Sequence, residues 1–358
     1  LTGRGDAISW WVKEIDELVI RKGRTITILS LACGNGDTEI GLLKKLASPD
    51  KVHFVGVDVN PNMIERARVA ALEDGIQNAS FEIQDLNNPN LQGPIDVILA
   101  NHSLHHLVEL DKLFQHLAEK ASEDVMFLIN DMIGRNGHVM WPNAHIVVQE
   151  IWRRLDQSYK LNGYSKRYDM TPFNRDCSED GFEGIRAENI LPALIKHFDI
   201  DLFLPFSTLI NRFVDRGYGN NFDANDEHDR QLILDILAVD IKLLKDKKLS
   251  PTQAFIRAQR KGSVQNPQFL FQTPEEAIAS RHYNLELNDY YREVEAFLPG
   301  KPNPVSEKML QEEINIPLVS VVIPVFNNLE FTHKCIKSML KNTRHPHYEV
   351  IIVDNAST

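Results

Sequence analysis

The sequence predicts an α/β protein with a doubly wound, mostly parallel sheet and a helical insertion, plus an incomplete β-α-β unit of a second α/β domain. Between residues 25 and 131, short apolar runs alternate with amphipathic helical patterns and are joined by short turns. Right-handed β-α-β crossovers produce this alternation. The first apolar run ends in the glycine-rich turn "LACGNG" at 31–36, where open parallel sheets bind ligands.

The first elements follow one another in a regular order. Apolar side chains recur on one face of residues 7–22, which predicts an amphipathic helix. Apolar runs then predict buried strands, and helical spacing predicts the helices between them. The strands are expected at 25–32, 51–59, 79–86, 95–101 and 124–131, and the helices at 37–48, 62–75 and 111–121.

The pattern changes after Asp131. We interpret residues 134–190 as a substrate-side insertion, with a helix from about 143 to 155. Residues 197–210 resume strand character, and residues 228–261 are expected to be helical. These segments complete a first domain that is expected to span residues 1–296.

A proline-rich stretch separates this domain from the rest of the chain. Residues 297–304 hold three prolines, which predicts a linker over 297–317. A single β-α-β unit follows at 318–358. One such unit cannot bury its own sheet, so we expect it to be the N-terminal part of a domain that is cut short.

Composition excludes several classes of protein. A net charge of −11 over 358 residues argues against a nucleic-acid binder, since phosphate contacts need a basic surface. The three cysteines lack the spacing of a disulfide framework or a zinc site, which suits a reducing compartment. The sequence shows no signal peptide or membrane span, and we expect a cytoplasmic protein.

Polar residues end successive predicted strands beside the glycine turn. Gly34 and Gly36 permit positive φ angles and let a ligand approach the backbone. Asp58 ends the second strand, where a carboxylate can accept ribose hydroxyl groups. Asp85 and Asn101 follow at the ends of the third and fourth strands, which predicts a polar ligand-binding edge.

The residues around the turn discriminate between nucleotide ligands. A dinucleotide site needs a third small residue for close helix packing, and Glu39 stands at that place. A carboxylate there would repel a diphosphate, so an NAD-dependent enzyme is disfavoured. No GxxxxGK[ST] phosphate loop occurs. A ligand with adenosine and no phosphate, S-adenosylmethionine, fits better.

The motifs "ITILSLACGNGDTE", "FVGVDVNPNMIERAR", "FEIQDL" and "IDVILANHSLHHL" resemble those of class I S-adenosylmethionine-dependent methyltransferases, over residues 25–131. In that family an acidic residue often stands in place of Ser30 and a glycine in place of Ala32. The resemblance implies that the turn binds the methionine part of the donor and that other strand tips bind the rest. The implied residues are Ala32, Cys33, Gly34 and Gly36 for methionine, Asp58 for ribose, Val59, Met63, Asp85 and Leu86 for adenine, and Asn101 near the sulfonium.

The last residues carry a second resemblance. "VSVVIPVFNN" and "YEVIIVDNAST" are similar to the opening of inverting GT-A-type (family 2) glycosyltransferases, which use nucleotide-sugar donors. By this resemblance, Asp354 contacts the nucleotide, and Pro324 and Phe326 line its pocket. The family's metal-binding and catalytic residues come later, so we expect no glycosyl transfer from this chain alone.

Histidines after the fourth strand are the candidates for acid–base chemistry. Methyl transfer to a hydroxyl group needs a base, and the predicted catalytic residues are His105, His106 and Asp131. Asp131 could orient an acceptor hydroxyl group or a histidine, or it could cap a helix or turn. His102 is assigned to the substrate. Although His102 and His106 have a spacing seen in metal pairs, HExxH is absent and no third ligand is evident. The sequence therefore predicts no metal site.

The insertion supplies further candidates for substrate binding. Arg135, His138 and Trp141 follow the fifth strand, and Trp141 could either stack on a sugar or pack in the core. Arg186 lies further along, and with Asp176 and Glu183 it could hold a phosphate or sugar or form an ion-pair network.

Together these observations predict an S-adenosylmethionine-dependent methyltransferase fused to a glycosyltransferase domain. The fusion suggests a sugar hydroxyl on a glycan or polysaccharide intermediate as the acceptor, and peripheral association with a polysaccharide-assembly complex. The alternative is a non-catalytic binding or scaffold module that positions the glycosyltransferase.

Overall fold

The computed structural model describes residues 7–282, 287–298, 319–325, 327, 329–342 and 348–354. The chain divides into two compact units, residues 1–302 and 303–358, which are considered separately below. The division falls within the linker expected at 297–317, most of which lies outside the described residues.

The first unit is built on one sheet, in which eight strands are seen among the described residues. The order is β3-β2-β1-β4-β5-β7-β6-β8, and β1 to β5 pair in parallel. Strand β7 runs antiparallel to both β5 and β6. The bounds are β1 Ile26–Leu31, β2 Val52–Asp58, β3 Ala79–Ile83, β4 Ile95–Asn101, β5 Ala121–Met132, β6 Phe198–Phe206, β7 Gln253–Arg260 and β8 Gln268–Phe269. This mostly parallel, doubly wound sheet confirms the predicted fold class.

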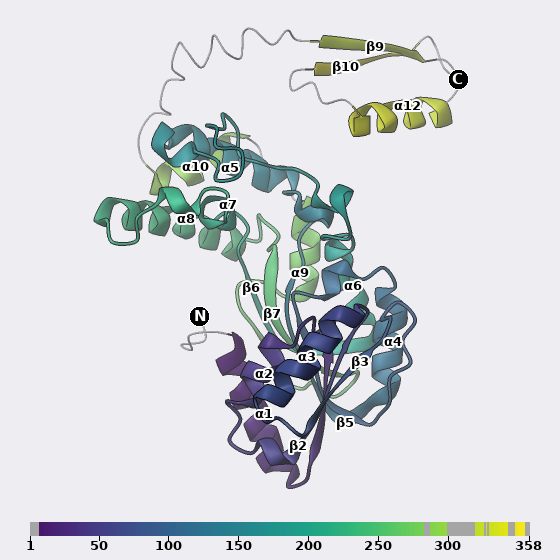
Figure 1. Cartoon of the computed structure of the whole chain (residues 1–358). Coiled ribbons are helices and arrows are strands. Elements are labelled where there is room, and N and C mark those ends of the chain that lie inside the picture. Colours follow the sequence, from purple (N-terminus) through teal and green to yellow (C-terminus); the bar gives the residue numbers. More distant parts are fainter. Residues whose placement is uncertain are drawn as a thin grey trace. The chain divides into compact units, whose positions relative to one another are not determined.

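Helices cover both faces of the sheet because successive strand residues point to opposite sides. Ile28 and Leu128 belong to the core under α1, α2 and α3, whereas their neighbours Leu29 and Ile129 belong to the core under α4, α6 and α9. Figure 1 shows α1, α2 and α3 together on one face and α4 and α6 on the other. The bounds are α1 Ala7–Lys22, α2 Asp37–Leu43, α3 Pro61–Glu73, α4 Leu110–Lys120, α6 Ala187–His197 and α9 Pro274–Ala279.

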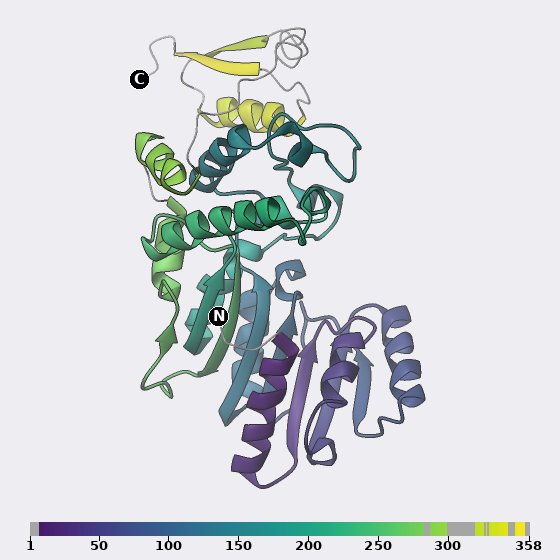
Figure 2. The same ribbon diagram turned by 90° about the vertical axis from the view of Figure 1, so that its left-hand side faces the viewer.

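A third apolar core lies outside the sheet and joins segments that are far apart in the sequence. It includes Trp152 of α5, Phe213 of α7, Val239 of α8 and Val294 of α10. Figures 1 and 2 show α5, α8 and α10 at the end of the sheet where β5 finishes and β7 begins. The bounds are α5 Pro142–Arg154, α7 Asn211–Val214, α8 Glu227–Lys245 and α10 Leu287–Phe297.

Several predicted elements agree closely with the structure, and one is wrong in part. Helix α1 and strand β4 have the predicted limits, whereas α2 and β3 end earlier than expected. The segment 228–261 is not helical throughout, because α8 ends at Lys245 and Gln253–Arg260 form strand β7. Lys247 has a left-handed φ of 59°, which ends the helical backbone, and Ala254, Ile256 and Ala258 then alternate with more exposed residues. This period of two belongs to a strand, which inserts between β5 and β6.

The second unit contains the expected β-α-β arrangement. Its elements are β9 Val319–Val325, α12 Leu329–Asn342 and β10 Tyr348–Asp354, and the two strands pair in parallel. In the described parts of both units, every helix is too short or too polar to cross a lipid bilayer.

Candidate functional site

The glycine turn after β1 has the left-handed backbone that its composition predicts. The φ angles are 55° at Gly34 and 77° at Gly36. A Cβ on Gly36 would lie 3.0 Å from the Cβ of Ala67, whereas one on Gly34 would meet nothing within 4 Å. Gly36 therefore allows α2 and α3 to pack, and Gly34 leaves the backbone open to a ligand. Ala32 also has a positive φ, of 48°, where glycine is favoured.

Asp58 joins the end of β2 to this turn. Its Oδ2 accepts a hydrogen bond from the Gly34 N–H at 2.9 Å, and its Oδ1 accepts one from the Asn60 N–H at 2.8 Å. A carboxylate has about four lone-pair positions, so these two bonds orient Asp58 and leave it able to accept from ribose hydroxyl groups. The carboxylate and the turn thus form one edge, as predicted.

The other residues assigned to the adenine differ in their exposure. The Val59 side chain is 65% exposed, so it is open to a ligand, and Met63 is half-buried. Asp85 is exposed and its carboxylate accepts from the Asn87 N–H. The side chain of Leu86, in contrast, is buried in the core, so only its backbone is left for the predicted adenine contact.

Cys33 and Glu39 both point into the protein. Cys33 packs in the core, and burial raises the pKa of its thiol, so it is a packing residue beside the turn. Glu39 is buried, and Ser30 Oγ donates to its Oε1 at 2.8 Å. Burial raises the pKa of Glu39 by more than the bond from Ser30 lowers it. The charge argument against a diphosphate is therefore weaker than the sequence suggested, because this carboxyl group faces Ser30.

Asn101, at the tip of β4, lies beside the turn. In the register of β1 and β4, Leu31 pairs with Ala100, which brings the next residues, Ala32 and Asn101, to the same edge. The Nδ2 of Asn130 on β5 donates to Asn101 Oδ1 at 2.9 Å and lies 3.2 Å from His102 Nε2. His102 is therefore held next to the predicted sulfonium position.

Asp131, at the end of β5, organises the loop that follows β4. The carboxylate is fully buried, and its Oδ2 accepts from the N–H groups of Ser103 and Leu104 at 2.9 and 2.8 Å. Its Oδ1 accepts from the Met132 N–H at 2.7 Å and contacts His105 Nδ1 at 2.6 Å. Because a carboxylate only accepts, His105 carries a proton on Nδ1 and directs Nε2 away from Asp131.

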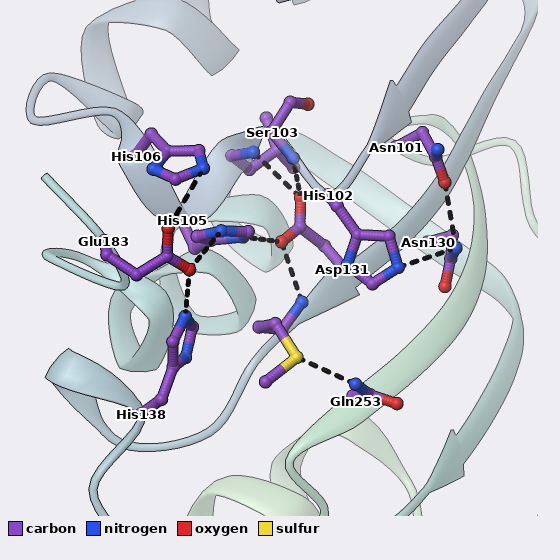
Figure 3. A network of polar contacts seen from close by, with 12 residues as sticks. Asn101, His102, Ser103, His105, His106, Asn130, Asp131, His138, Glu183 and Gln253 are labelled. Atoms are coloured by element: carbon purple, nitrogen blue, oxygen red, sulfur yellow. Dashed lines mark hydrogen bonds and ion pairs between the residues drawn. The ribbon is translucent and has the colours of Figure 1, made fainter. Parts of the chain in front are cut away.

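Glu183 lies at the centre of three histidines (Figure 3). Its Oε1 is 3.5 Å from His105 Nε2 and 2.8 Å from His138 Nε2, and its Oε2 is 3.8 Å from His106 Nε2. We call His105, His106, His138 and Glu183, together with Asp131, the histidine cluster. The insertion supplies Glu183 and His138, so it reaches the edge formed by β4 and β5.

Burial and charge act in opposite directions on the pKa values of this cluster. Burial lowers the pKa of His105, but the hydrogen bond to Asp131 and the charge of Glu183 outweigh it, so the net shift is upward. Burial lowers the pKa of His138 by more than Glu183 raises it. Burial also raises the pKa of Glu183, but His138 and the other histidines reverse this and lower it. A neutral His138 donating to an ionised Glu183 fits these directions.

Three residues predicted to bind substrate already contact other parts of the protein. Trp141 is buried in the third core, with the guanidinium groups of Arg135 and Arg281 within 6.0 and 5.5 Å of its ring centroid, so it does not offer a stacking face to a sugar. Arg135 also donates to the Met140 carbonyl group. Arg186 donates to the carbonyl group of Val108 at 2.7 Å and to Asn189. These arginines connect loops around the site.

Glu183 completes a group of possible metal ligands that the sequence did not reveal. Among the described residues, one group has the spacing of metal ligands, namely His105, His106 and Glu183, whose ligand atoms lie within 4.8 Å of one another. Sequence analysis placed Glu183 among arginines, as a sugar-binding or ion-pairing residue. Its separation from the histidines in the sequence is large, and no local spacing could have revealed their proximity. The expectation from the sequence that this chain has no metal site stays an untested prediction.

In the second unit, the predicted nucleotide-sugar residues are described only in part. Pro324 lies in β9 and is exposed, and Asp354 is the last residue of β10. The two strands are parallel, and Pro324 pairs with Val353, so both residues lie near one end of the strand pair. Phe326 lies outside the described residues.

Comparison with known protein families identifies two regions. A family model described as methyltransferase domain matches residues 22–167. A second model, glycosyl transferase family 2, matches residues 320–358. The two matches fall in separate compact units, and they confirm both resemblances.

Similar proteins match the first region. Aklanonic acid methyltransferase DauC of Streptomyces sp. (strain C5) is 32% identical over 22% of this chain and 34% of its own. Ajmaline N-methyltransferase of Rauvolfia serpentina is 24% identical over 30% of this chain and 37% of its own length. Malonyl-[acyl-carrier protein] O-methyltransferase of Bacillus cereus is 27% identical over 35% of this chain and 43% of its own length. The chain thus spans less than half the length of these relatives.

Two solved structures are also similar to this chain. An S-adenosylmethionine-dependent methyltransferase from Clostridium acetobutylicum is 22% identical, with a TM-score of 0.29, over 35% of this chain and 54% of its own. Geranyl diphosphate C-methyltransferase from Streptomyces coelicolor, in complex with S-adenosyl-L-homocysteine, is 12% identical, with a TM-score of 0.39. The match covers 69% of this chain and 80% of that protein's own chain.

Proposed function

We propose, from the premise that residues 22–167 form a methyltransferase domain, that the chain transfers the methyl group of S-adenosylmethionine to a sugar hydroxyl group. The acceptor would belong to a glycan or polysaccharide intermediate. The observation that carries this proposal is the histidine cluster, which adjoins the glycine turn at the same edge of the sheet.

The donor side of the proposal depends on the turn and Asp58. The open backbone at Gly34 leaves room for the methionine part, and the Asp58 carboxylate can accept from the ribose hydroxyl groups. Asn101 and His102 would then lie near the sulfonium. This arrangement holds the methyl group toward the ends of β4 and β5, where the histidine cluster begins.

Methyl transfer is an in-line displacement in which much of the barrier is removed by positioning. A lone pair of the acceptor oxygen forms the new O–C bond, the C–S bond breaks, and the sulfur leaves as the thioether of S-adenosylhomocysteine. The acceptor hydroxyl group must also lose its proton. Asp131 holds a proton on Nδ1 of His105, so Nε2 of His105 carries a lone pair and can accept the proton of the acceptor hydroxyl group.

A sugar acceptor is favoured by the chemistry of both units. The cluster combines a proton acceptor with polar side chains, as a hydroxyl substrate requires. The second unit matches a glycosyl transferase family, so sugar chemistry occurs in the same chain. We propose association with a polysaccharide-assembly complex on the same ground. A cytoplasmic location is supported by the three free cysteines.

Calorimetry with S-adenosylmethionine tests the donor site. We expect the chain to bind the donor and Asp58→Ala to weaken binding strongly, because the carboxylate both orients the turn and accepts from ribose. Asp50→Ala is the matched control, since Asp50 is exposed in the η1 turn (Pro49–Lys51), before β2. A folded chain that binds no donor would refute the proposal.

Methyl transfer from radiolabelled donor to a panel of glycans and nucleotide sugars tests the acceptor. We expect labelled sugar product from the wild-type chain and a loss of at least about 100-fold for His105→Gln, in the range that a general base contributes. Donor binding without any methylated acceptor would favour the non-catalytic scaffold instead.

A further inference from the structure

We propose that His105, His106 and Glu183 form a binding site for a divalent transition-metal ion of the zinc type. The proposal rests on the proposed function only in the use it assigns to the ion, since the binding itself follows from the geometry of the cluster. Two imidazole nitrogens and a carboxylate oxygen are a donor set that zinc and similar ions accept.

The spacing of the three ligand atoms suits one ion. Glu183 Oε1 lies 3.5 Å from His105 Nε2, and Glu183 Oε2 lies 3.8 Å from His106 Nε2. Ligand atoms that are each about 2.0–2.1 Å from a tetrahedral zinc ion are roughly 3.3–3.4 Å apart. The three ligand atoms lie within 4.8 Å of one another, so the exposed side chains of His106 and Glu183 would have to move inward to bind one ion.

Each of the three ligands has an outer partner that fixes its orientation. His105 Nδ1 is bound to Asp131 at 2.6 Å, and His106 Nδ1 lies 3.1 Å from the Phe182 carbonyl oxygen. Glu183 Oε1 is bound by His138 Nε2 at 2.8 Å. Metal-binding histidines typically donate their second ring nitrogen to a carboxylate or a backbone carbonyl group. Figure 3 shows this arrangement for His105 and Asp131.

The proton on His105 adds an electrostatic reason for a cation. Because Asp131 holds that proton on Nδ1, the lone pair of His105 Nε2 faces the Glu183 carboxylate. Two lone pairs that face each other repel unless a cation lies between them. Either a second proton on His105 or a metal ion bound to both atoms satisfies this requirement, and only the metal ion would also be bound by His106, whose Nε2 lies by the other carboxylate oxygen.

The open side of the cluster leaves room for a further ligand. The His105 side chain is 4% exposed, whereas those of His106 and Glu183 are 41% and 49% exposed. Catalytic zinc sites have three protein ligands and one open position. An acceptor hydroxyl group bound there would have its pKa lowered by the ion and would release its proton to water. In the metal-bound chain the ion would therefore take over from His105 Nε2, which it occupies, the task of removing that proton; the O–C bond would still form as the C–S bond breaks.

Cobalt spectroscopy on the full chain tests the site without requiring activity. Tag-free protein is stripped with a chelator and titrated with Co²⁺, and then with Zn²⁺ in competition with a chromophoric indicator. We expect one ion for each chain, with the d–d absorption bands of a four- or five-coordinate site. Glu183→Gln and His106→Gln should each weaken binding by more than about 100-fold, the upper limit for loss of an outer partner.

His53→Gln provides the matched control, because His53 is an exposed histidine of β2 outside the cluster. It should bind the ion as the wild type does. The use of two ligand variants protects the test if one of them fails to fold. Stoichiometric binding that is lost in a folded ligand variant supports the site, whereas absent binding, or equal affinity in the ligand variants and His53→Gln, overturns it.

Donor binding separates this inference from the proposed function. S-adenosylmethionine should bind the metal-free chain, because Asp58 and the turn contain none of the three ligands. Metal binding without donor binding would refute the methyltransferase proposal alone. Donor binding and methyl transfer by a chain that binds no metal would refute the metal site alone.

Discussion

Replacing Asp131 by asparagine should disturb both the stability and the chemistry of the site. The wild-type carboxylate accepts four hydrogen bonds, two at each oxygen, from three backbone N–H groups and His105 Nδ1. An asparagine offers one carbonyl oxygen and one amide nitrogen of similar shape. If the oxygen keeps Ser103 and Leu104, the nitrogen faces Met132 N–H and His105 Nδ1, which are both donors.

The expected cost follows from these contacts. A hydrogen bond to a charged group contributes about 1.5–3 kcal/mol, and a donor left without a partner costs about 1–3 kcal/mol more when buried. Met132 is only partly buried, so the second contribution falls at the lower end. We expect Asp131→Asn to lower the free energy of unfolding by about 3 kcal/mol, measured by urea denaturation.

The variant should also change the tautomer of His105. With an amide N–H facing Nδ1, the imidazole gains by moving its proton to Nε2, and it then loses the acceptor that faces Glu183. Nitrogen NMR of histidine-labelled protein reports the protonated ring nitrogen, and methyl transfer should fall by about 100-fold or more.

Asp124→Asn is the matched control for Asp131→Asn. The Asp124 side chain is 54% exposed, and its partner Lys22 would keep its ion pair with Asp96, so this change should cost less than about 1 kcal/mol. An Asp131→Asn chain that unfolds within about 1 kcal/mol of the wild type and keeps the His105 tautomer would refute the reasoning.

Two further predictions concern the scaffold of the site. Burial works to raise the pKa of Asp96, but hydrogen bonds from Arg24 and Lys22 outweigh it and hold the pKa at about 2, below the ordinary 3.8. This stabilisation is present above pH 4 and is lost as the pH falls toward 2. The destabilisation caused by Asp96→Asn, measured by urea denaturation, should therefore shrink by about 2 kcal/mol between pH 5 and pH 2. A difference between the variant and the wild type that does not vary with pH would contradict this prediction. Gly36→Ala should lower the free energy of unfolding by about 2–4 kcal/mol, because a left-handed φ and a Cβ contact of 3.0 Å add together. Gly75→Ala has the φ cost without the contact and should cost about 1–2 kcal/mol, so equal losses would argue against packing at Gly36.

The sequence predicted the elements of the sheet from local patterns. Ile26–Leu31 and Ile95–Asn101 are apolar runs bounded by turn residues, and the apolar stripe of Ala7–Lys22 sets both limits of α1. Strand β7 was missed because its short alternating pattern follows soon after the helical pattern of α8. Only the pairing with β5 and β6 shows that a strand period of two, and not a helical period, applies there.

The edge of the sheet that is proposed to bind the methyl donor could also be predicted from the sequence. Asp58 and Gly34 belong to successive strand ends, and strand ends of a parallel sheet meet by topology. Side-chain direction was not predictable at the same positions. Leu86 and Trp141 are buried and Glu39 turns toward Ser30, because packing against distant residues decides which way each side chain points.

What the sequence by itself determined is therefore the periodic part of the molecule: the order of strands and helices, the turn at residues 32–36 and the carboxylate that faces it. What only the tertiary structure decided is the histidine cluster. His105, His138 and Glu183 meet because the insertion returns to the end of β5, where Asp131 is buried. Local spacing encodes contacts along one element, whereas a site made from three distant segments depends on how the chain folds back on itself.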